Sequence, residues 1–498
     1  MEGRAGNGQA ALDALDVDIG RRGTIRLQLL TQIRTAIHAL RLPGGTRLPS
    51  TRAVAARFGI SRTTVTEVFD QLLAEGMLIA RHGSGTYVSP ALPARAPRES
   101  EAKPATSWER VSRRGKLFAD ITTRSRYVNK EPQAFQPGVP AIDVFPFAAW
   151  SRIAASFLRR PPRELVSYGD PAGLRTLRDA VAAGLRDAHG VACDADQVVI
   201  TTGSQQSLDL IMRLMLDPDE PVWLEEPGSL AVRAAFVSAG ARVVAVPVDA
   251  DGMMIDDGVA AEPRARLAHV TAASQWPTTA PLAAPRRAAL VRWADAADAW
   301  IVEDEYDGVF RYDGTVPPSL RSLARADRVL SIGSFSLTTF PALRIGYVVV
   351  PHALVDAFVA AKAAIDRQGA TLEHAVLAEF VHSGRYARHV RAMHEVYAER
   401  REALARCARE YLPSFAYASP RAGLHGILTL DAHDDVAVSR AAAARGISAV
   451  PLSRLYFGRP RRSGLLLGFG IASPGELRLA VRKLRDAIAE VPARRVRR

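Results

Sequence analysis

Two short segments of the sequence carry residues that could bind a small charged ligand. Thr202-Gly203-Ser204-Gln205-Gln206 follows an apolar run and opens a helical pattern, and a glycine turn at a helix N-terminus presents free N–H groups to an anion. Glu303-Asp304-Glu305-Tyr306 ends another apolar run. A buried carboxylate there could pair with a protonated ring nitrogen, and the tyrosine could donate to a ring oxygen. Taken alone, each segment also has an ordinary explanation, a structural turn for the first and a solvated loop for the second.

The elements around these segments predict an α/β domain. Apolar β-type runs alternate with helical stretches at 197–201, 221–224, 242–246, 269–271, 299–302, 329–332 and 345–350. Buried strands that alternate with helices favour a mostly parallel sheet. Ligands of such sheets bind at the carboxyl ends of the strands. Both polar segments follow predicted strands, so we expect them at that edge.

The distribution of charge points to a second, different partner. The chain of 498 residues has a net charge of +13, and its length favours two to four domains. Only five lysines occur, so an arginine-rich proteome explains part of the excess. Residues 21–92, however, hold ten arginines against three acids, a local excess of 10 − 3 = +7. A basic segment of this kind suits a polyanion such as DNA.

Cysteine content and hydropathy favour a cytoplasmic protein without a metal site. The sequence contains only Cys193 and Cys407. Two distant cysteines give neither a disulfide framework nor zinc-ligand spacing, which suits a reducing compartment. Residues 1–20 lack the apolar core of a signal peptide. We expect no membrane-spanning helix, because no apolar run approaches about 18 residues.

Residues 21–92 carry the signals of three short helices and a β-hairpin. Leu30, Ile33, Ile37 and Leu40 are spaced as one apolar helix face. Ser50 can cap a second helix that runs to Phe58, with Gly59 ending it, and Ser61 can cap a third helix that ends before Gly76. Two short strands then flank the basic, glycine-rich tip 81–86.

This segment resembles the winged helix-turn-helix DNA-binding domain of the GntR family. The matching residues are Gly45-Thr-Arg-Leu-Pro-Ser50, Ser61-Arg-Thr-Thr64, Gln71-Leu-Leu-Ala-Glu-Gly76 and Gly83-Ser-Gly-Thr86. The resemblance implies that Arg52, Arg62, Thr63 and Thr64 contact DNA, while His82 and Gly83 reach the minor groove. The alternative is a three-helix protein-interaction module with solvated arginines.

Composition also sets the expected domain boundaries. Residues 1–20 are expected to form a flexible tail, and the winged helix is assigned to 21–92. Prolines 90, 93, 97 and 104 mark the start of a semi-extended connector, and the linker is assigned to 93–130. The remainder, 131–498, is assigned to one large domain with a smaller C-terminal α+β subdomain at about 375–498.

The stretch Gly333–Tyr347 resembles the active-site segment of fold-type I pyridoxal-phosphate (PLP) enzymes. That segment contains Ser-Phe-Ser-Lys-Thr in the family, and its lysine forms a Schiff base with PLP. Here the sequence is Ser334-Phe-Ser-Leu-Thr338, with Leu337 at the lysine position. Tyr168-Gly-Asp-Pro-Ala-Gly173, Glu226-Pro-Gly228, Asp304-Glu-Tyr-Asp307 and Phe340-Pro-Ala-Leu-Arg344 match as well. Together with the winged helix, the chain is similar to the MocR subfamily of GntR regulators.

The resemblance implies a set of cofactor contacts. Phosphate contacts fall on Ser204, Gln205, Ser334, Ser336 and Arg344. Asp304 would pair with the pyridine nitrogen and Tyr306 with the 3-oxygen. Arg461 or Arg462 is a candidate for binding a substrate carboxylate.

Four positions depart from the family pattern around one pocket. Leu337 replaces the lysine, Ser229 the stacking tyrosine, Ser274 a histidine and Thr279 a glycine. Leucine supplies no nucleophilic amine, so a covalent aldimine at position 337 is not possible and there is no catalytic residue there. Non-covalent PLP remains possible.

A rescuing lysine elsewhere is not expected. We expect Lys362 on the surface, and Lys130 or Lys483 would have to approach from far along the chain.

The preferred function is therefore a transcription regulator that binds a double-stranded DNA operator. Its aminotransferase-like domain would dimerise and sense a small ligand. The resemblance implies a homodimer in which each winged helix crosses over to its partner's body. The alternative is a PLP-dependent aminotransferase with an appended DNA-binding domain.

Overall fold

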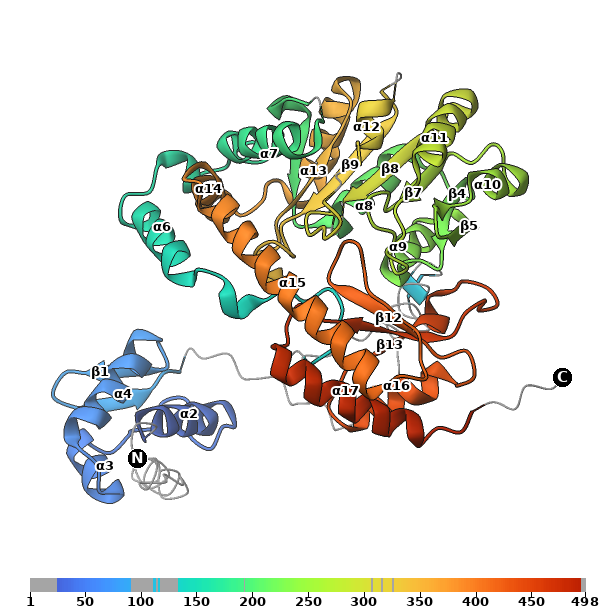
Figure 1. Cartoon of the computed structure of the whole chain (residues 1–498). Coiled ribbons are helices and arrows are strands. Elements are labelled where there is room, and N and C mark those ends of the chain that lie inside the picture. Colours follow the sequence, from blue (N-terminus) through green and yellow to red (C-terminus); the bar gives the residue numbers. More distant parts are fainter. Residues whose placement is uncertain are drawn as a thin grey trace. The chain divides into compact units, whose positions relative to one another are not determined.

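The computed structural model describes residues 25–90, 111–112, 115–116, 133–191, 193–305, 308–314, 317–324 and 327–493. The chain divides into two compact units, Met1–Ser107 and Trp108–Arg498, shown in Figure 1. The predicted tail 1–20 lies outside the described residues, as does most of the predicted linker 93–130.

The N-terminal unit is a winged helix. It contains α2 (Ile25–His38), α3 (Thr51–Phe58), α4 (Arg62–Ala74) and the antiparallel hairpin β1 (Leu78–Arg81) with β2 (Gly85–Val88). The predicted caps are present: Ser50 Oγ accepts from Ala53 N, and Ser61 Oγ accepts from Thr64 N. Gly59 ends α3 with a left-handed φ of 63°, a conformation that glycine adopts without the penalty of a Cβ atom.

One expectation for this unit is wrong. Leu40 was placed on the apolar face of the first helix, but α2 ends at His38 and Leu40 is 58% exposed. The chain turns there, with Leu40 at φ 56°. Leu42 is instead fully buried in the core with Leu29, Ile33, Val65 and Phe69.

The large unit is built on an eight-stranded sheet of order β3-β10-β9-β8-β7-β4-β5-β6. The strands are β3 (Val198–Thr201), β4 (Pro221–Glu226), β5 (Arg242–Asp249), β6 (Gly252–Met253), β7 (Leu267–Val270), β8 (Trp300–Glu305), β9 (Val329–Ser334) and β10 (Gly346–Val349). β10 is antiparallel to both β3 and β9, and β6 is antiparallel to β5. The other pairs in the described sheet are parallel. The prediction of a mostly parallel α/β sheet is therefore confirmed.

Helices cover both faces of this sheet (Figure 1). α8 (Ser204–Met215), α9 (Leu230–Ala239) and α13 (Val355–Asp366) pack on one face, around Leu224, Val302 and Ile332. α10 (Ile255–Ala261), α11 (Ala284–Ala297) and α12 (Leu320–Leu323) pack on the other. α6 (Phe147–Arg159), α7 (Arg175–His189) and α14 (Thr371–His382) pack together beside β3 and β10.

A second, smaller sheet forms the C-terminal part of the unit. Its strands, in the order β11-β12-β14-β13, are β11 (Tyr417–Ala418), β12 (His425–Thr429), β14 (Gly464–Gly468) and β13 (Val450–Pro451), all antiparallel. The helices α15 (Arg385–Tyr411), α16 (Asp435–Ala444) and α17 (Pro474–Ala489) share its core. These elements make the expected smaller α+β part.

In the described part of the chain, no helix has the length and apolar character needed to cross a bilayer. Within the same residues, no cluster of histidine, cysteine or acidic side chains has the arrangement of a metal site. Both cysteines are buried free thiols.

Candidate functional site

The predicted anion-binding residues meet at one edge of the large sheet. Thr201 at the end of β3 and Ser334 at the end of β9 both pair with Gly346, the first residue of β10. The segments that follow β3 and β9, together with the segment that enters β10, therefore lie next to each other. This register brings Ser204, Ser334 and Arg344 to a common edge from positions far apart in the sequence.

Glycine and arginine shape the centre of this edge. Gly203 precedes α8 with φ 115°, and a Cβ atom there would fall 2.9 Å from Nη2 of Arg344. A Cβ atom on Gly346 would fall 2.8 Å from Cα of Gly203. Ser204 at the N-terminus of α8 is half-buried, and Arg344 beside Gly203 is an exposed residue. Such an arrangement suits an anion, because helix N-termini carry partial positive charge.

The two serines complete the same corner. Ser334 Oγ donates to Ser336 Oγ at 3.0 Å and accepts from Ser336 N at 3.2 Å. Ser204, Ser334 and Ser336 are all half-buried, while Gln205 is exposed on the first turn of α8. We define these four residues, with Gly203 and Arg344, as the anion cradle. The individual phosphate contacts remain predictions.

Asp304 lies one strand away, beside a histidine that the sequence analysis missed. The carboxylate Oδ2 of Asp304 is 3.5 Å from Nε2 of His269 on β7. Both side chains are buried. Nε2 of His269 has no hydrogen-bond partner among the described residues. A buried carboxylate at this place could accept a hydrogen bond from a protonated ring nitrogen of a ligand. Tyr306, the predicted partner of the 3-oxygen, lies outside the described residues.

Leu337 has become part of an apolar core. Its side chain is 6% exposed and belongs to the cluster that includes Phe310, Met393 and Tyr397. The lysine position of the family segment is thus filled by packed hydrocarbon.

The other three departures have different outcomes. Ser229 caps α9, where its Oγ accepts from Val232 N at 3.4 Å. Ser274 is 4% exposed, and its Oγ has no hydrogen-bond partner among the described residues. Thr279 has a left-handed backbone, with φ 60°. A β-branched residue in this region is strained.

Buried acids support the loops around the site. Glu225 at the end of β4 accepts from Thr271 N at 3.2 Å and from Thr271 Oγ1 at 2.6 Å, and burial raises its pKa. Glu303 on β8 accepts from Leu320 N at 2.9 Å. Burial and the neighbouring charge of Glu305 raise the pKa of Glu303 to about 7.

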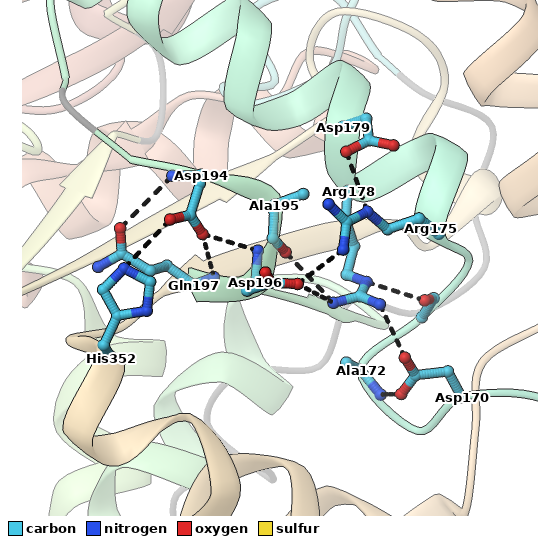
Figure 2. A network of polar contacts seen from close by, with 11 residues as sticks. Asp170, Ala172, Arg175, Arg178, Asp179, Asp194, Ala195, Asp196, Gln197 and His352 are labelled. Atoms are coloured by element: carbon cyan, nitrogen blue, oxygen red, sulfur yellow. Dashed lines mark hydrogen bonds and ion pairs between the residues drawn. The ribbon is translucent and has the colours of Figure 1, made fainter.

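A polar network fixes the loop that carries the motif Tyr168–Gly173 (Figure 2). Arg178 is buried, and its guanidinium donates to Asp170 Oδ2 at 2.7 Å, Gly173 O at 3.1 Å and Ala195 O at 3.2 Å. Tyr168 nevertheless remains 79% exposed, with the guanidinium of Arg367 4.2 Å from its ring centre. The loop therefore presents an aromatic side chain on a backbone that these hydrogen bonds hold.

The predicted DNA-contacting residues lie on accessible parts of the winged helix. Arg52 on α3 and both Arg62 and Thr63 at the start of α4 are exposed, as are His82 and Gly83 at the wing tip. Their side chains or backbone are therefore free to approach a duplex.

Two details refine this interface. Thr64 is only half-buried, and its Oγ1 lies 2.8 Å from the capping Ser61 Oγ, so its hydroxyl is already engaged. Arg47, which the sequence analysis did not select, lies against the wing: a Cβ atom on Gly85 would be 3.2 Å from its Nε.

Comparison with protein families assigns both units. Residues 26–88 match the model of the bacterial regulatory proteins of the gntR family. Residues 148–481 match the model of aminotransferase class I and II. The chain is 36% identical over 462 residues to the probable rhizopine catabolism regulatory protein MocR of Rhizobium meliloti, covering 92% of this chain and 93% of the relative. The chain belongs to the MocR subfamily of GntR regulators.

Other similar proteins match either most of this MocR-type regulator or its large unit. The pyridoxine biosynthesis transcriptional regulator PdxR of Corynebacterium glutamicum is 30% identical, covering 94% of this chain and 96% of the relative. Among solved structures, a multiple substrate aminotransferase from Thermococcus profundus superposes with a TM-score of 0.69 at 27% identity, covering 76% of this chain and 97% of that one. The chain is thus a DNA-binding transcription regulator with an aminotransferase-like body.

One expectation about the MocR-type body is wrong. Lys362 was expected on the surface, but it is 1% exposed. It lies on α13, which packs against α8, and its Nζ is 2.8 Å from Asp366 Oδ1. Arg461 and Arg462, the candidates for binding a carboxylate, are exposed in the loop before β14, and their role remains a prediction.

His269, Glu225 and Arg47 are the residues that sequence reasoning missed. His269 and Glu225 each lie in or at the end of a predicted buried strand, where a polar side chain is unusual. That signal was available for both. For Arg47, the sequence offered no signal except its place within a motif that matches the GntR family.

Proposed function

We propose that this regulator binds a phosphate-bearing small molecule in its body without forming a covalent bond at position 337. Pyridoxal phosphate is the first candidate. The observation that carries the proposal is a contrast along one segment. Ser334 and Ser336 are half-buried at the sheet edge, while Leu337 at the lysine position is buried in an apolar core.

The residues present fit the charged ends of pyridoxal phosphate. The glycine turn before α8, Arg344 and the two serines would hold its phosphate, and Asp304 would face its ring nitrogen. Bound in an enzyme, the cofactor acts as an electron sink for reactions at amino acids. This chain lacks the amine that would attach the cofactor and move the proton, so the alternative of an aminotransferase is not favoured.

The regulatory arrangement is a homodimer. The exposed side chains of Val166 and Tyr168, at 68% and 79%, are candidates for contact with a second copy. Each winged helix would cross over to the partner's body, and paired half-sites follow from two-fold symmetry. A ligand controls such a dimer only if it binds with different affinity to two arrangements of the winged helices. The name of the relative PdxR, a pyridoxine biosynthesis regulator, supports a ligand of this class.

Borohydride reduction in the presence of pyridoxal phosphate tests the proposal. We expect the ligand to raise the melting midpoint, because it binds the folded state. After reduction and denaturation, mass spectrometry should find no pyridoxyl adduct in the pocket. A stoichiometric adduct on one lysine would overturn non-covalent binding, and an unchanged midpoint would overturn the phosphate-bearing ligand.

A further inference from the structure

The buried lysine of α13 has no place in the function proposed above. Lys362 is 1% exposed, and its ammonium pairs with Asp366 one turn further along the helix at 2.8 Å. Removing an ammonium from water is costly unless it is paired and hydrogen-bonded. Replacing such a pair by apolar residues is often neutral for stability, so stability alone does not explain its presence.

The pair is connected directly to the anion cradle. The other oxygen of Asp366, Oδ2, accepts from Nε2 of Gln206 at 2.7 Å. Gln206 lies in the first turn of α8, and its Oε1 accepts from the backbone N of Thr202 at 2.8 Å. Thr202 and Gln206 thus clamp the turn that contains Gly203 and Ser204. The chain of contacts runs from Lys362 through Asp366 and Gln206 to the turn itself.

Charge explains why a lysine is needed. Asp366 brings a carboxylate to within one side chain of a turn suited to an anion, and an unpaired carboxylate there would repel that anion. Lys362 cancels this charge. The nearby His374 does not supply this charge in the wild-type protein, because burial and the charge of Lys362 lower its pKa to about 4.

We propose that Lys362 is a positioning residue for the phosphate end of the ligand. It neutralises Asp366, which orders Gln206 and thereby the turn Thr202–Ser204, so that the pocket selects a phosphate monoester over its dephosphorylated form. This inference rests on the proposed function, because it concerns the same ligand.

The inference predicts an asymmetry that a purely structural ion pair would not produce. Lys362→Met leaves a carboxylate facing the cradle, and we expect it to weaken pyridoxal phosphate binding on the order of 10-fold. Asp366→Asn removes the repelling charge but keeps an oxygen that can accept from Gln206 Nε2, so it should bind the phosphate ester at least as well as wild type does. The double variant Lys362→Met/Asp366→Asn should recover most of the loss.

The experiment measures dissociation constants of the full-length variants for pyridoxal phosphate and for pyridoxal, with inorganic phosphate as competitor. Gln206→Leu, which breaks both clamping bonds, should lower the preference for pyridoxal phosphate over pyridoxal. Arg213→Gln is the control on the same helix, since its pair with Asp209 is 60% and 40% exposed. If Lys362→Met does not fold, the double variant and Gln206→Leu decide the question, because neither leaves an unpaired buried charge.

The outcomes separate the two proposals. Wild-type protein that binds neither pyridoxal phosphate nor inorganic phosphate overturns the proposed ligand, and this inference with it. The positioning role alone is overturned if wild type binds but Lys362→Met and Asp366→Asn lose equal affinity for pyridoxal phosphate. It is also overturned if Gln206→Leu keeps the wild-type preference for pyridoxal phosphate over pyridoxal. The predicted asymmetry supports both.

Discussion

The guanidinium of Arg344 lies against Gly203, so close that a Cβ atom at position 203 would be 2.9 Å from its Nη2. Gly203 and Arg344 are far apart in the sequence, and this contact brings them together in the anion cradle. The backbone at Gly203 has φ 115°, which L side chains rarely adopt. Both constraints make this glycine the most sensitive point of the cradle.

Gly203→Ala should therefore lose affinity for pyridoxal phosphate, because the new methyl group displaces Arg344. We also expect a loss of about 1–2 kcal/mol in unfolding free energy from backbone strain. Gly190→Ala is the control: Gly190 also has a positive φ, 63°, but no heavy atom lies within 4 Å of its Cβ position. Denaturant titration should show both losses of stability. Retained ligand affinity in Gly203→Ala would contradict the assignment of the cradle.

Leu337→Lys should restore the missing amine at a cost in stability. The side chain enters an apolar cluster with Phe310 and Tyr397, so we expect a destabilisation of about 2–4 kcal/mol. Burial lowers the pKa of an ammonium and leaves part of the amine neutral and nucleophilic. Borohydride reduction with pyridoxal phosphate should then trap an adduct at position 337. Leu337→Met, which conserves volume, should show neither effect, and failure to trap an adduct in folded Leu337→Lys would count against a retained ligand geometry.

Thr279→Gly should stabilise the body. The left-handed φ of 60° at Thr279 costs a β-branched residue roughly 1–2 kcal/mol, part of which glycine loses again through its larger unfolded-state entropy. We expect a net gain of about 0.5–1 kcal/mol in urea titration. Thr278→Gly should instead destabilise, because Thr278 Oγ1 donates to Gln275 Oε1 at 2.7 Å. The same sign for both variants would rule out the strain explanation.

Glu303→Gln should change how stability depends on pH. Burial and the charge of Glu305 raise the pKa of Glu303 to about 7, above its ordinary value of 4.5. The folded protein therefore holds this proton more tightly than the unfolded chain does. The contribution of Glu303 to the free energy of unfolding is fully present below about pH 4.5. This contribution is lost as the pH rises through about 7.

Glutamine keeps an acceptor for Leu320 N but cannot ionise. From pH 5 to pH 8, the unfolding free energy of the variant minus that of wild type should therefore increase by about 2–3 kcal/mol. Buried His374 and His425, whose pKa values are lowered to about 4, act equally in both proteins and cancel in the difference. Urea titrations at the two pH values measure it, and parallel stability curves would show that Glu303 does not titrate in this range.

The sequence was sufficient for the parts of the fold that depend on local signals. Ser50 and Ser61 cap their helices as predicted. A serine before an amphipathic run predicts a cap because its hydroxyl can accept from a free N–H of the first turn. The alternation of strands and helices was enough to predict a mostly parallel sheet. The position of Ser204 near Ser334 also followed, because both come after strands that end at one edge.

Long-range packing was not predictable in the same way. Lys362 was expected on the surface because lysine is rarely buried, and only the fold brings Asp366 and Gln206 around it. Likewise, the pairing of β7 with β8 places His269 next to Asp304, and the sequence did not reveal this proximity. The prediction for Leu40 was wrong for a local reason. The apolar spacing continues to Leu40, but the chain leaves the helix after His38 and turns at Leu40.

We expect this regulator to contact its operator through the exposed residues at the start of α4. Selection of bound duplexes from a random library by the full-length protein tests it most directly. We predict enrichment of two related half-sites, and binding to the enriched duplex weakened by roughly 1–3 kcal/mol in Arg62→Ala. Glu67→Gln, a change on the same helix that adds no phosphate contact, should keep the enriched sequence. No enrichment by the wild-type protein, or unchanged affinity in Arg62→Ala, would contradict the account.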